Sequence, residues 1–249
     1  MFNADILDIT LIGFLAGILG TGLGGLFALI IRKPKKELLS FFLGFAGGIM
    51  LAIVFTDLLP EAVEIGGFIT ALFGLVLGTI LMLLLDIYLP HAHFSESTDG
   101  GTSYIRTGVM LGLGIAMHNL PEGIAIGAGY VASPSIGLAL AVTISLHNVP
   151  EGLAMATPMN AGGLNVFKTL LYTGMAGVPM GIGAFIGSSI SNISPYILSI
   201  SLGFAGGAML YIIFDELIPD AQNIAQGHSG TFGAIFGAIA GILLLYILH

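Results

Sequence analysis

Long apolar stretches alternate with short polar connections along the chain. Each stretch holds about 20 mostly apolar residues, the length that a helix needs to cross roughly 30 Å of hydrocarbon. The strict alternation of apolar and polar residues that marks membrane strands is absent, and helices are the other way to satisfy backbone polar groups in lipid. The pattern predicts an all-α, polytopic membrane protein with eight transmembrane helices, at residues 6–31, 39–62, 68–89, 106–130, 135–159, 167–190, 196–221 and 231–248.

The composition agrees with a single transmembrane domain over residues 1–249. Hydrophobic residues make up 56% of the chain and charged residues 8%, against about 25% charged residues in a soluble globular domain. So few charges cannot cover a water-exposed surface. Six basic residues and a net charge of −8 exclude a nucleic-acid-binding protein, and the lack of cysteine excludes a disulfide-stapled secreted domain. We therefore expect a multi-pass protein of the cell membrane (inner or plasma membrane), surrounded by lipid.

The basic residues predict the orientation of the chain in the membrane. All six lie in or beside the connections that follow the first, third and fifth helices: Arg32, Lys33, Lys35, Lys36, Arg106 and Lys168. Because short cytoplasmic connections carry an excess of lysine and arginine, these connections are expected in the cytoplasm and both termini outside it. The connection at residues 90–105 is then a cytoplasmic loop. The N-terminus lacks the basic region of a cleavable signal, so the first apolar stretch is expected to remain as a helix.

Two segments far apart in the chain resemble each other residue by residue. Residues 44–51 (GFAGGIML) match residues 203–210 (GFAGGAML), and the match continues from residues 55–62 to residues 214–221. The segments lie in the second and seventh helices, which cross the membrane in opposite directions. The chain is therefore expected to hold an inverted repeat, helices 1–3 and 6–8 around the central helices 4 and 5, as is usual in secondary transporters.

Acidic residues follow the repeated segments near both ends of the bundle. By the predicted orientation, one pair lies near the external mouth and the other near the cytoplasmic mouth: Asp57 and Glu61, and Glu216 and Asp220. Carboxylates at both mouths suit a path for cations, and these four residues are predicted to line or gate it. Glu64 and Asp86 are interpreted instead as solvated acids at helix ends.

Residues 118–123 (HNLPEG) recur as residues 147–152 (HNVPEG), and each copy lies in the middle of a predicted helix. An ionised side chain at that depth costs about 2.5–3.5 kcal/mol on insertion scales, so the two glutamates need a compensating partner. Histidine and glutamate four residues apart share a helix face. Two such faces opposed would offer two imidazoles and two carboxylates, a ligand set suited to zinc and other first-row divalent ions. The predicted ligands are His118, Glu122, His147 and Glu151.

Neighbouring residues extend this prediction. Asn119 and Asn148 lie about 100° around their helices, within reach of a second ion or of the groups around the ligands. Pro121 and Pro150 cannot donate the usual backbone hydrogen bond, which predicts a kink and free carbonyls beside the ligands.

Other functions share some of these features. A membrane-embedded, zinc-dependent hydrolase also needs buried zinc ligands, but it typically carries an HExxH motif, whereas the spacing here is H-x-x-x-E. A metal-sensing or structural membrane subunit would bind metal tightly without moving it. In the predicted loop, His91 and His93 fit a cytoplasmic metal hand-off site and an ordinary solvated loop equally well.

The paired motifs resemble the fourth and fifth helices of the ZIP (Zrt/Irt-like) metal transporters, most closely the bacterial GufA and ZupT-type branch. The resemblance covers nearly the whole chain. It implies an importer of Zn²⁺, often also of Fe²⁺, Mn²⁺, Co²⁺ or Cd²⁺, that works without enzymatic activity, commonly as a homodimer and with an elevator-like movement. It also implies a binuclear site in mid-membrane.

Carried over to this chain, the resemblance adds Met50 to the first site as a soft ligand. The second site would use the two asparagines, with Glu122 and Glu151 bridging. In this branch a glutamate just before a proline in the sixth helix usually completes that second site. Here Val178 occupies the position, so the second site is expected to be weak or absent.

Overall fold

The computed structural model describes residues 5–31, 35–88, 100–225 and 227–248, apart from the side chains of residues 100–103 and 118. Within these ranges the chain is helical, without strands, and eight helical segments are long and apolar enough to cross a membrane. The predicted fold class is thereby confirmed. The segments run over Ile6–Ile31, Lys36–Gly66, Phe68–Tyr88, Tyr104–Ala132, Pro134–Ala161, Val166–Ser191, Pro195–Ile224 and Ser229–Leu248.

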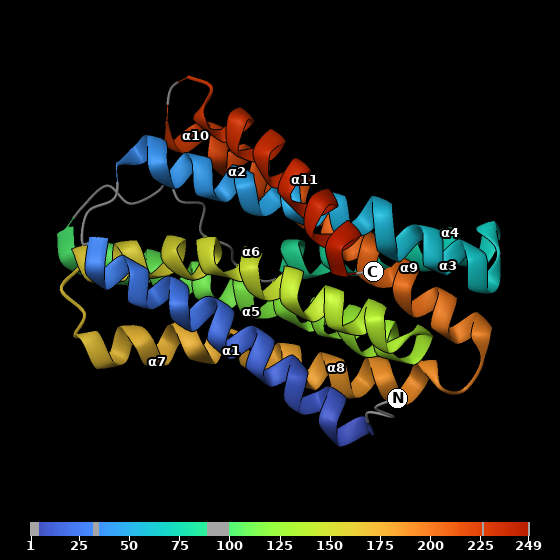
Figure 1. Cartoon of the computed structure of the whole chain (residues 1–249). Coiled ribbons are helices and arrows are strands. Elements are labelled where there is room, and N and C mark those ends of the chain that lie inside the picture. Colours follow the sequence, from blue (N-terminus) through green and yellow to red (C-terminus); the bar gives the residue numbers. More distant parts are fainter. Residues whose placement is uncertain (1–4, 32–34, 89–99, 226, 249) are drawn as a thin grey trace.

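The individual helices are arranged along one bundle (Figure 1). Five are uninterrupted: α1 (Ile6–Ile31), α4 (Phe68–Tyr88), α5 (Gly100–Ala132), α6 (Pro134–Ala161) and α11 (Ser229–Leu248). Because α5 begins at Gly100, the end of the predicted loop at residues 90–105 is helical; its two histidines, His91 and His93, lie outside the described residues. Pro121 and Pro150 lie inside continuous helices, so neither proline ends its helix.

The second and seventh spans each contain a π-helical turn that the sequence analysis did not predict. The second consists of α2 (Lys36–Ile53), η1 (Val54–Leu58) and α3 (Leu59–Gly66), and the seventh of α9 (Pro195–Ile212), η3 (Ile213–Leu217) and α10 (Ile218–Ile224). Pro60 and Pro219 follow the two turns. A proline lacks an N–H and its ring clashes with the carbonyl one turn earlier, and a wider π turn at that point relieves both problems.

The sixth span is broken near its middle. Its two parts are α7 (Val166–Ala176) and α8 (Val178–Ser191), with Pro179 in the first turn of α8. At the break, Gly177 lies against the backbone of Gly17 in α1, where an added Cβ would lie 2.2 Å from a backbone carbon. The continuous helix predicted at residues 167–190 is thus two helices.

The helix contacts follow the predicted inverted repeat. Helix α2 of the first half packs against α11 of the second, and its counterpart α9 packs against α4 of the first; likewise α1 packs against α6, and α8 against α5. The correspondence reaches single hydrogen bonds. Ser40 Oγ donates to the carbonyl oxygen of Ala221 (2.5 Å), and Ser199 Oγ donates to that of Ala62 (2.6 Å). These residues are related by the same spacing that relates Gly44 to Gly203, so the two halves share one backbone plan.

Small residues let the repeated helices approach closely. A Cβ added to Gly48 would lie 2.1 Å from the carbonyl oxygen of Ala234, and one added to Gly207 would lie 1.9 Å from that of Leu75. Glycine is therefore required at both positions for the backbones to touch, as is common where helices pack in membranes.

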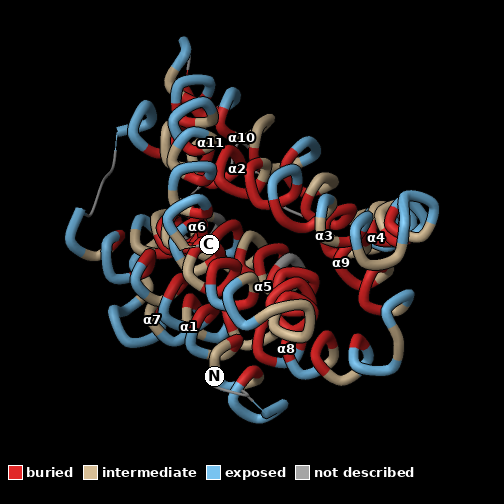
Figure 2. Tube along the Cα trace, turned by 45° about the vertical axis from the view of Figure 1, so that its right-hand side comes forward, coloured by how far each residue is buried: buried red, intermediate tan, exposed pale blue. Residues whose placement is uncertain are grey.

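The interior of the bundle is formed by the second, fifth and seventh spans, each 67% buried over its most apolar window, whereas α4 and α11 are 22% buried. Figure 2 shows exposed residues along both helices, and large apolar side chains are among them, such as Phe73 and Leu84 of α4 and Phe236 of α11. Such surfaces suit contact with lipid. The first residues of α1 and the last residues of α11 both lie away from the end of the bundle at which α2, α5 and α7 begin (Figure 1).

Candidate metal centre

The doubled motif forms a polar group in the interior of the bundle. Glu122 lies in α5, and His147 and Glu151 lie one turn apart in α6. One oxygen of each carboxylate and one ring nitrogen of the histidine all lie within 4.8 Å of one another. All three side chains are buried. The packing of α5 against α6 thus brings together three of the four side chains assigned to the first site from the sequence.

A hydrogen bond of 2.9 Å joins His147 Nε2 to Glu122 Oε1. The other oxygen, Glu122 Oε2, has no hydrogen-bond partner among the described residues. Two carboxylates shielded from water in this way repel each other and lack solvation. Imidazole nitrogen and carboxylate oxygen are ligands that zinc prefers, and a doubly positive ion would balance both charges. The group is therefore suited to bind a divalent cation.

His118 lies one turn before Glu122 in α5, but its side chain lies outside the described part of the structure. Its role as the fourth ligand stays a prediction.

The two asparagines form a second polar layer beside this group. Asn148 Nδ2 donates to Asn119 Oδ1 (3.1 Å), and Asn119 Nδ2 donates to the carbonyl oxygen of Ala176 (2.8 Å). Asn148 Oδ1 has no hydrogen-bond partner among the described residues. Ala176 is the last residue of α7, and carbonyls at a helix end lack their usual partner, so the break in the sixth span provides this acceptor.

Sequence reasoning missed the contact with Ala176, although the run Gly177, Val178, Pro179 could have predicted a helix break. Val178 begins α8 and is half-buried. Val178, at the position where the sequence resemblance implies an acid, thus lies two residues beyond Ala176, whose carbonyl Asn119 contacts. The second ion site, with Asn119 and Asn148 as ligands, stays a prediction.

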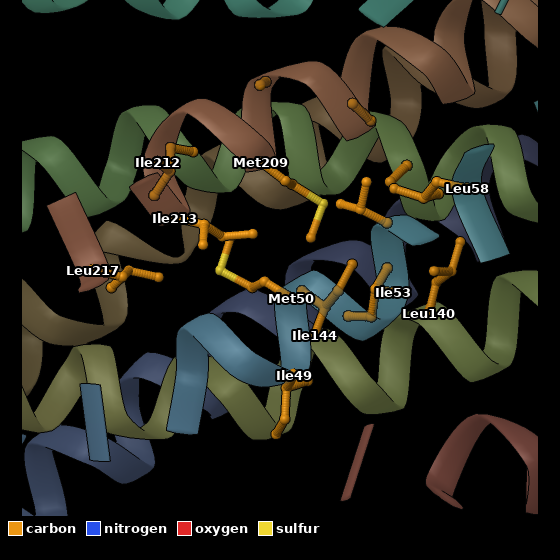
Figure 3. Packing of buried hydrophobic residues seen from close by; sticks show 14 of the residues in the cluster. Ile49, Met50, Ile53, Leu58, Leu140, Ile144, Met209, Ile212, Ile213 and Leu217 are labelled. Atoms are coloured by element: carbon orange, nitrogen blue, oxygen red, sulfur yellow. The ribbon is translucent and has the colours of Figure 1, made fainter. Parts of the chain in front are cut away.

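Met50 lies in the hydrophobic core between α2 and α9. Its side chain is fully buried and extends toward Ile213, close to Ile53 and Met209 (Figure 3). Packing of this kind is an ordinary use of methionine. Its assignment as a soft metal ligand stays a prediction.

The four acids predicted at the mouths lie in or just after the two π-helical turns. Asp57 is in η1 and 6% exposed, Glu61 follows in α3, Glu216 is in η3 and Asp220 is in α10. Because the second and seventh spans run in opposite directions, the two pairs lie toward opposite ends of the bundle (Figure 1). π-helical turns occur frequently at functional sites, and the assignment of these residues to a cation path stays a prediction.

The solvated interpretation fits Glu64 but not Asp86. Glu64 is exposed. Asp86 is half-buried near the end of α4, and its Oδ2 accepts a 3.0 Å hydrogen bond from the hydroxyl of Tyr211 in α9. The interpretation was wrong for Asp86 because the packing partner of α4 is distant in sequence and presents a donor there.

Comparisons with known proteins point to one family. The sequence model of the family described as ZIP Zinc transporter matches residues 91–249. The zinc transporter ZupT of Xanthomonas axonopodis pv. citri is 35% identical to this chain, covering 93% of the chain and 92% of that protein. The zinc transporter ZupT of Chlorobium limicola is 35% identical, with 90% and 91% coverage, and that of Akkermansia muciniphila is 35% identical, with 98% coverage of both proteins. With the doubled motif, the eight spans and these similarities together, the chain belongs to the ZIP zinc transporter family.

Proposed function

We propose that this protein carries Zn²⁺ across the membrane into the cytoplasm and binds it on the way between α5 and α6. The observation that supports the proposal most directly is the buried group of Glu122, His147 and Glu151 within 4.8 Å. Membership of a zinc transporter family agrees with it. The alternative of a zinc-dependent hydrolase is set aside, because the family and the relatives are named as transporters and not as enzymes.

The chemistry of the group explains how an ion could cross an apolar barrier. A zinc ion that enters the group exchanges its water for carboxylate and imidazole ligands, so neither the ion nor the acids remain uncompensated in the low-dielectric interior. His147 binds through a ring nitrogen only when that nitrogen is unprotonated, so binding displaces protons. We assign His118 as a further ligand from α5, Met50 as a soft ligand from α2, and the asparagines to a weaker second position.

The path on either side follows from the inverted repeat. Asp57 and Glu61 would attract the ion outside, and Glu216 and Asp220 would receive it on the cytoplasmic side, with His91 and His93 as a hand-off site beyond them. This orientation places both termini outside the cytoplasm, in agreement with the positive-inside rule. We further propose a homodimer embedded in lipid, and transport of Fe²⁺, Mn²⁺, Co²⁺ or Cd²⁺ as well, because nitrogen and oxygen ligands accept several of these ions.

The test is zinc uptake into proteoliposomes that contain the purified full-length chain and a zinc-sensitive dye. We expect His147→Ala to lose most of the uptake, and the matched variant of an exposed histidine, His228→Ala, to retain it. Equal uptake by wild type and His147→Ala would refute the site. Competition of each other divalent ion with zinc, measured in the same vesicles, tests the broader substrate range.

A further inference from the structure

An apolar groove of about 510 Å³ lies between α1, α2 and α6. Its volume is in the range of about 300–1,000 Å³ that small-molecule sites occupy. All the side chains that line it are aliphatic or aromatic or belong to proline, and none carries a charge or a hydrogen-bonding group. The principal ones are Leu23, Phe27 and Ile31 of α1, Phe42 and Phe45 of α2, and Leu153 of α6.

The groove marks a departure from the repeat. The span that corresponds to α1 consists of α7 and α8, and α9 corresponds to α2; α8 makes only a limited contact with α9, to which residues 192–194 connect it. Among the described residues, α1 and α2 make less contact still. The residue that corresponds to Phe42 is Ser201. The groove therefore lies between two helices that are held together mainly through α6.

Basic residues lie at one end of this groove. Ile31 is the last residue of α1, and α2 begins at Lys36, preceded by Lys35. Both lysines are exposed. Lys35 directly precedes α2 and Lys36 begins it, so both lie about 10 Å from Phe42 along the helix axis. The corresponding residues in the other half, Ser194 and Pro195, carry no charge.

We propose that the groove is a binding site for an anionic phospholipid, with an acyl chain along the apolar lining and the headgroup phosphate at Lys35 and Lys36. The lining suits hydrocarbon, and exposed lysines at a membrane surface attract acidic headgroups. A peptide segment is a poorer occupant, because its backbone would meet no hydrogen-bonding side chain in the groove.

The bound chain would touch the helix that carries the metal ligands. Leu153 and Leu146 line the groove, whereas Glu151 lies about 140–160° and His147 about 100–120° around the α6 axis from these two leucines. The lipid would therefore pack behind the metal centre and between α6 and α2, where it can influence how these helices move relative to each other. The binding itself does not depend on the transport that we propose.

The test is native mass spectrometry of the full-length chain, released from micelles that contain equal amounts of phosphatidylglycerol and phosphatidylcholine with long acyl chains. We expect wild type to retain phosphatidylglycerol preferentially. The double variant Lys35→Gln with Lys36→Gln should lose about 30-fold of that preference, the factor expected for two lysines near an anionic headgroup. Lys168→Gln, an exposed lysine away from the groove, should leave the preference unchanged.

Two variants test the acyl chain separately. Leu23→Trp fills the groove from α1 and Phe42→Trp fills it from α2, and each should abolish lipid retention. The control is Ile182→Trp, which lies at the position corresponding to Leu23 and is equally exposed. This control variant should still retain the lipid. Phosphatidylglycerol with six-carbon chains should fail to compete. Undiminished retention in the double lysine variant, or in both tryptophan variants of the groove, would overturn the proposal, as would full competition by the short-chain lipid. Zinc uptake, measured in parallel, reports separately on the transport function.

Discussion

Glu122→Gln changes the charge of the metal centre while it preserves the shape of the side chain. Gln can still accept the 2.9 Å hydrogen bond that Glu122 Oε1 makes with His147 Nε2. What disappears is one of two negative charges that lie within 4.8 Å in the buried group. The same substitution should therefore act in opposite directions on the metal-free and the metal-bound protein.

The magnitude follows from Coulomb's law. At an effective dielectric constant of about 20, two unit charges at the 4.8 Å limit repel each other by about 3.5 kcal/mol when both carboxylates are ionised. Removing one charge relieves this repulsion, so the metal-free variant should unfold at a higher temperature than wild type. The bound ion, in contrast, loses an anionic ligand. Loss of a group that only supports a ligand already weakens metal binding about 10–100-fold, so loss of the ligand itself should weaken zinc binding by at least about 100-fold.

Two measurements on the same purified protein test this reasoning. Thermal unfolding after treatment with a chelator gives the stability of the metal-free state, and calorimetric titration with zinc gives the affinity. Glu64→Gln, which removes an exposed acid, serves as the control and should change neither. A metal-free Glu122→Gln protein that unfolds below wild type, or one that binds zinc as tightly as wild type does, would contradict the electrostatic argument.

Three further predictions follow from the packing around the centre. Val178→Glu places a carboxylate one residue beyond the break in the sixth span. We expect this variant to raise the zinc bound per chain from about one ion toward two, as measured by elemental analysis. An unchanged ratio of zinc to protein would contradict the interpretation of the second site. Gly207→Ala drives a methyl group to 1.9 Å from a backbone carbonyl and should lower the unfolding temperature, whereas Gly22→Ala, with nothing within 4 Å, should not. Ser40→Ala and Ser199→Ala each remove a buried hydrogen bond between repeats, and each should lower the free energy of unfolding by about 1 kcal/mol. Because the two sites are far apart, the losses should add in the double variant. Strongly non-additive losses would contradict this.

The membrane fold was predictable from local properties of the sequence. Span length and hydropathy determine where helices cross lipid, and the repeat of residues 44–51 at residues 203–210 reveals the opposed direction of the two halves. The proximity of Glu122 to Glu151 was predictable for a related reason. Consecutive membrane helices joined by a short turn must lie side by side, and a motif at mid-span in both then meets its copy.

Other features could not be predicted from the sequence pattern, and two of them depend on a helix that is distant in sequence. The π-helical turns before Pro60 and Pro219 resolve a conflict between proline and an otherwise continuous helix, which could also have been resolved by a kink. The hydrogen bond from Asn119 to Ala176 exists because the sixth span breaks where it passes α5. The partner of Asp86 was invisible for the same reason, since Tyr211 belongs to a helix four spans away.

The two halves of the repeat share a common backbone arrangement. The residues that differ between the halves make the two ends of the bundle unlike each other. Several contacts recur in both halves, such as the hydrogen bonds of Ser40 and Ser199, although the sixth span is broken at Gly177 and the first is continuous. The hydrogen bond between Tyr211 and Asp86 has no counterpart, because the corresponding residues are Ala52 and Leu245. Phe42, which lines the groove, and Lys35 beside it correspond to serines in the other half, Ser201 and Ser194. A conformation that breaks the Tyr211 contact therefore loses a hydrogen bond that its counterpart in the other half does not have to break.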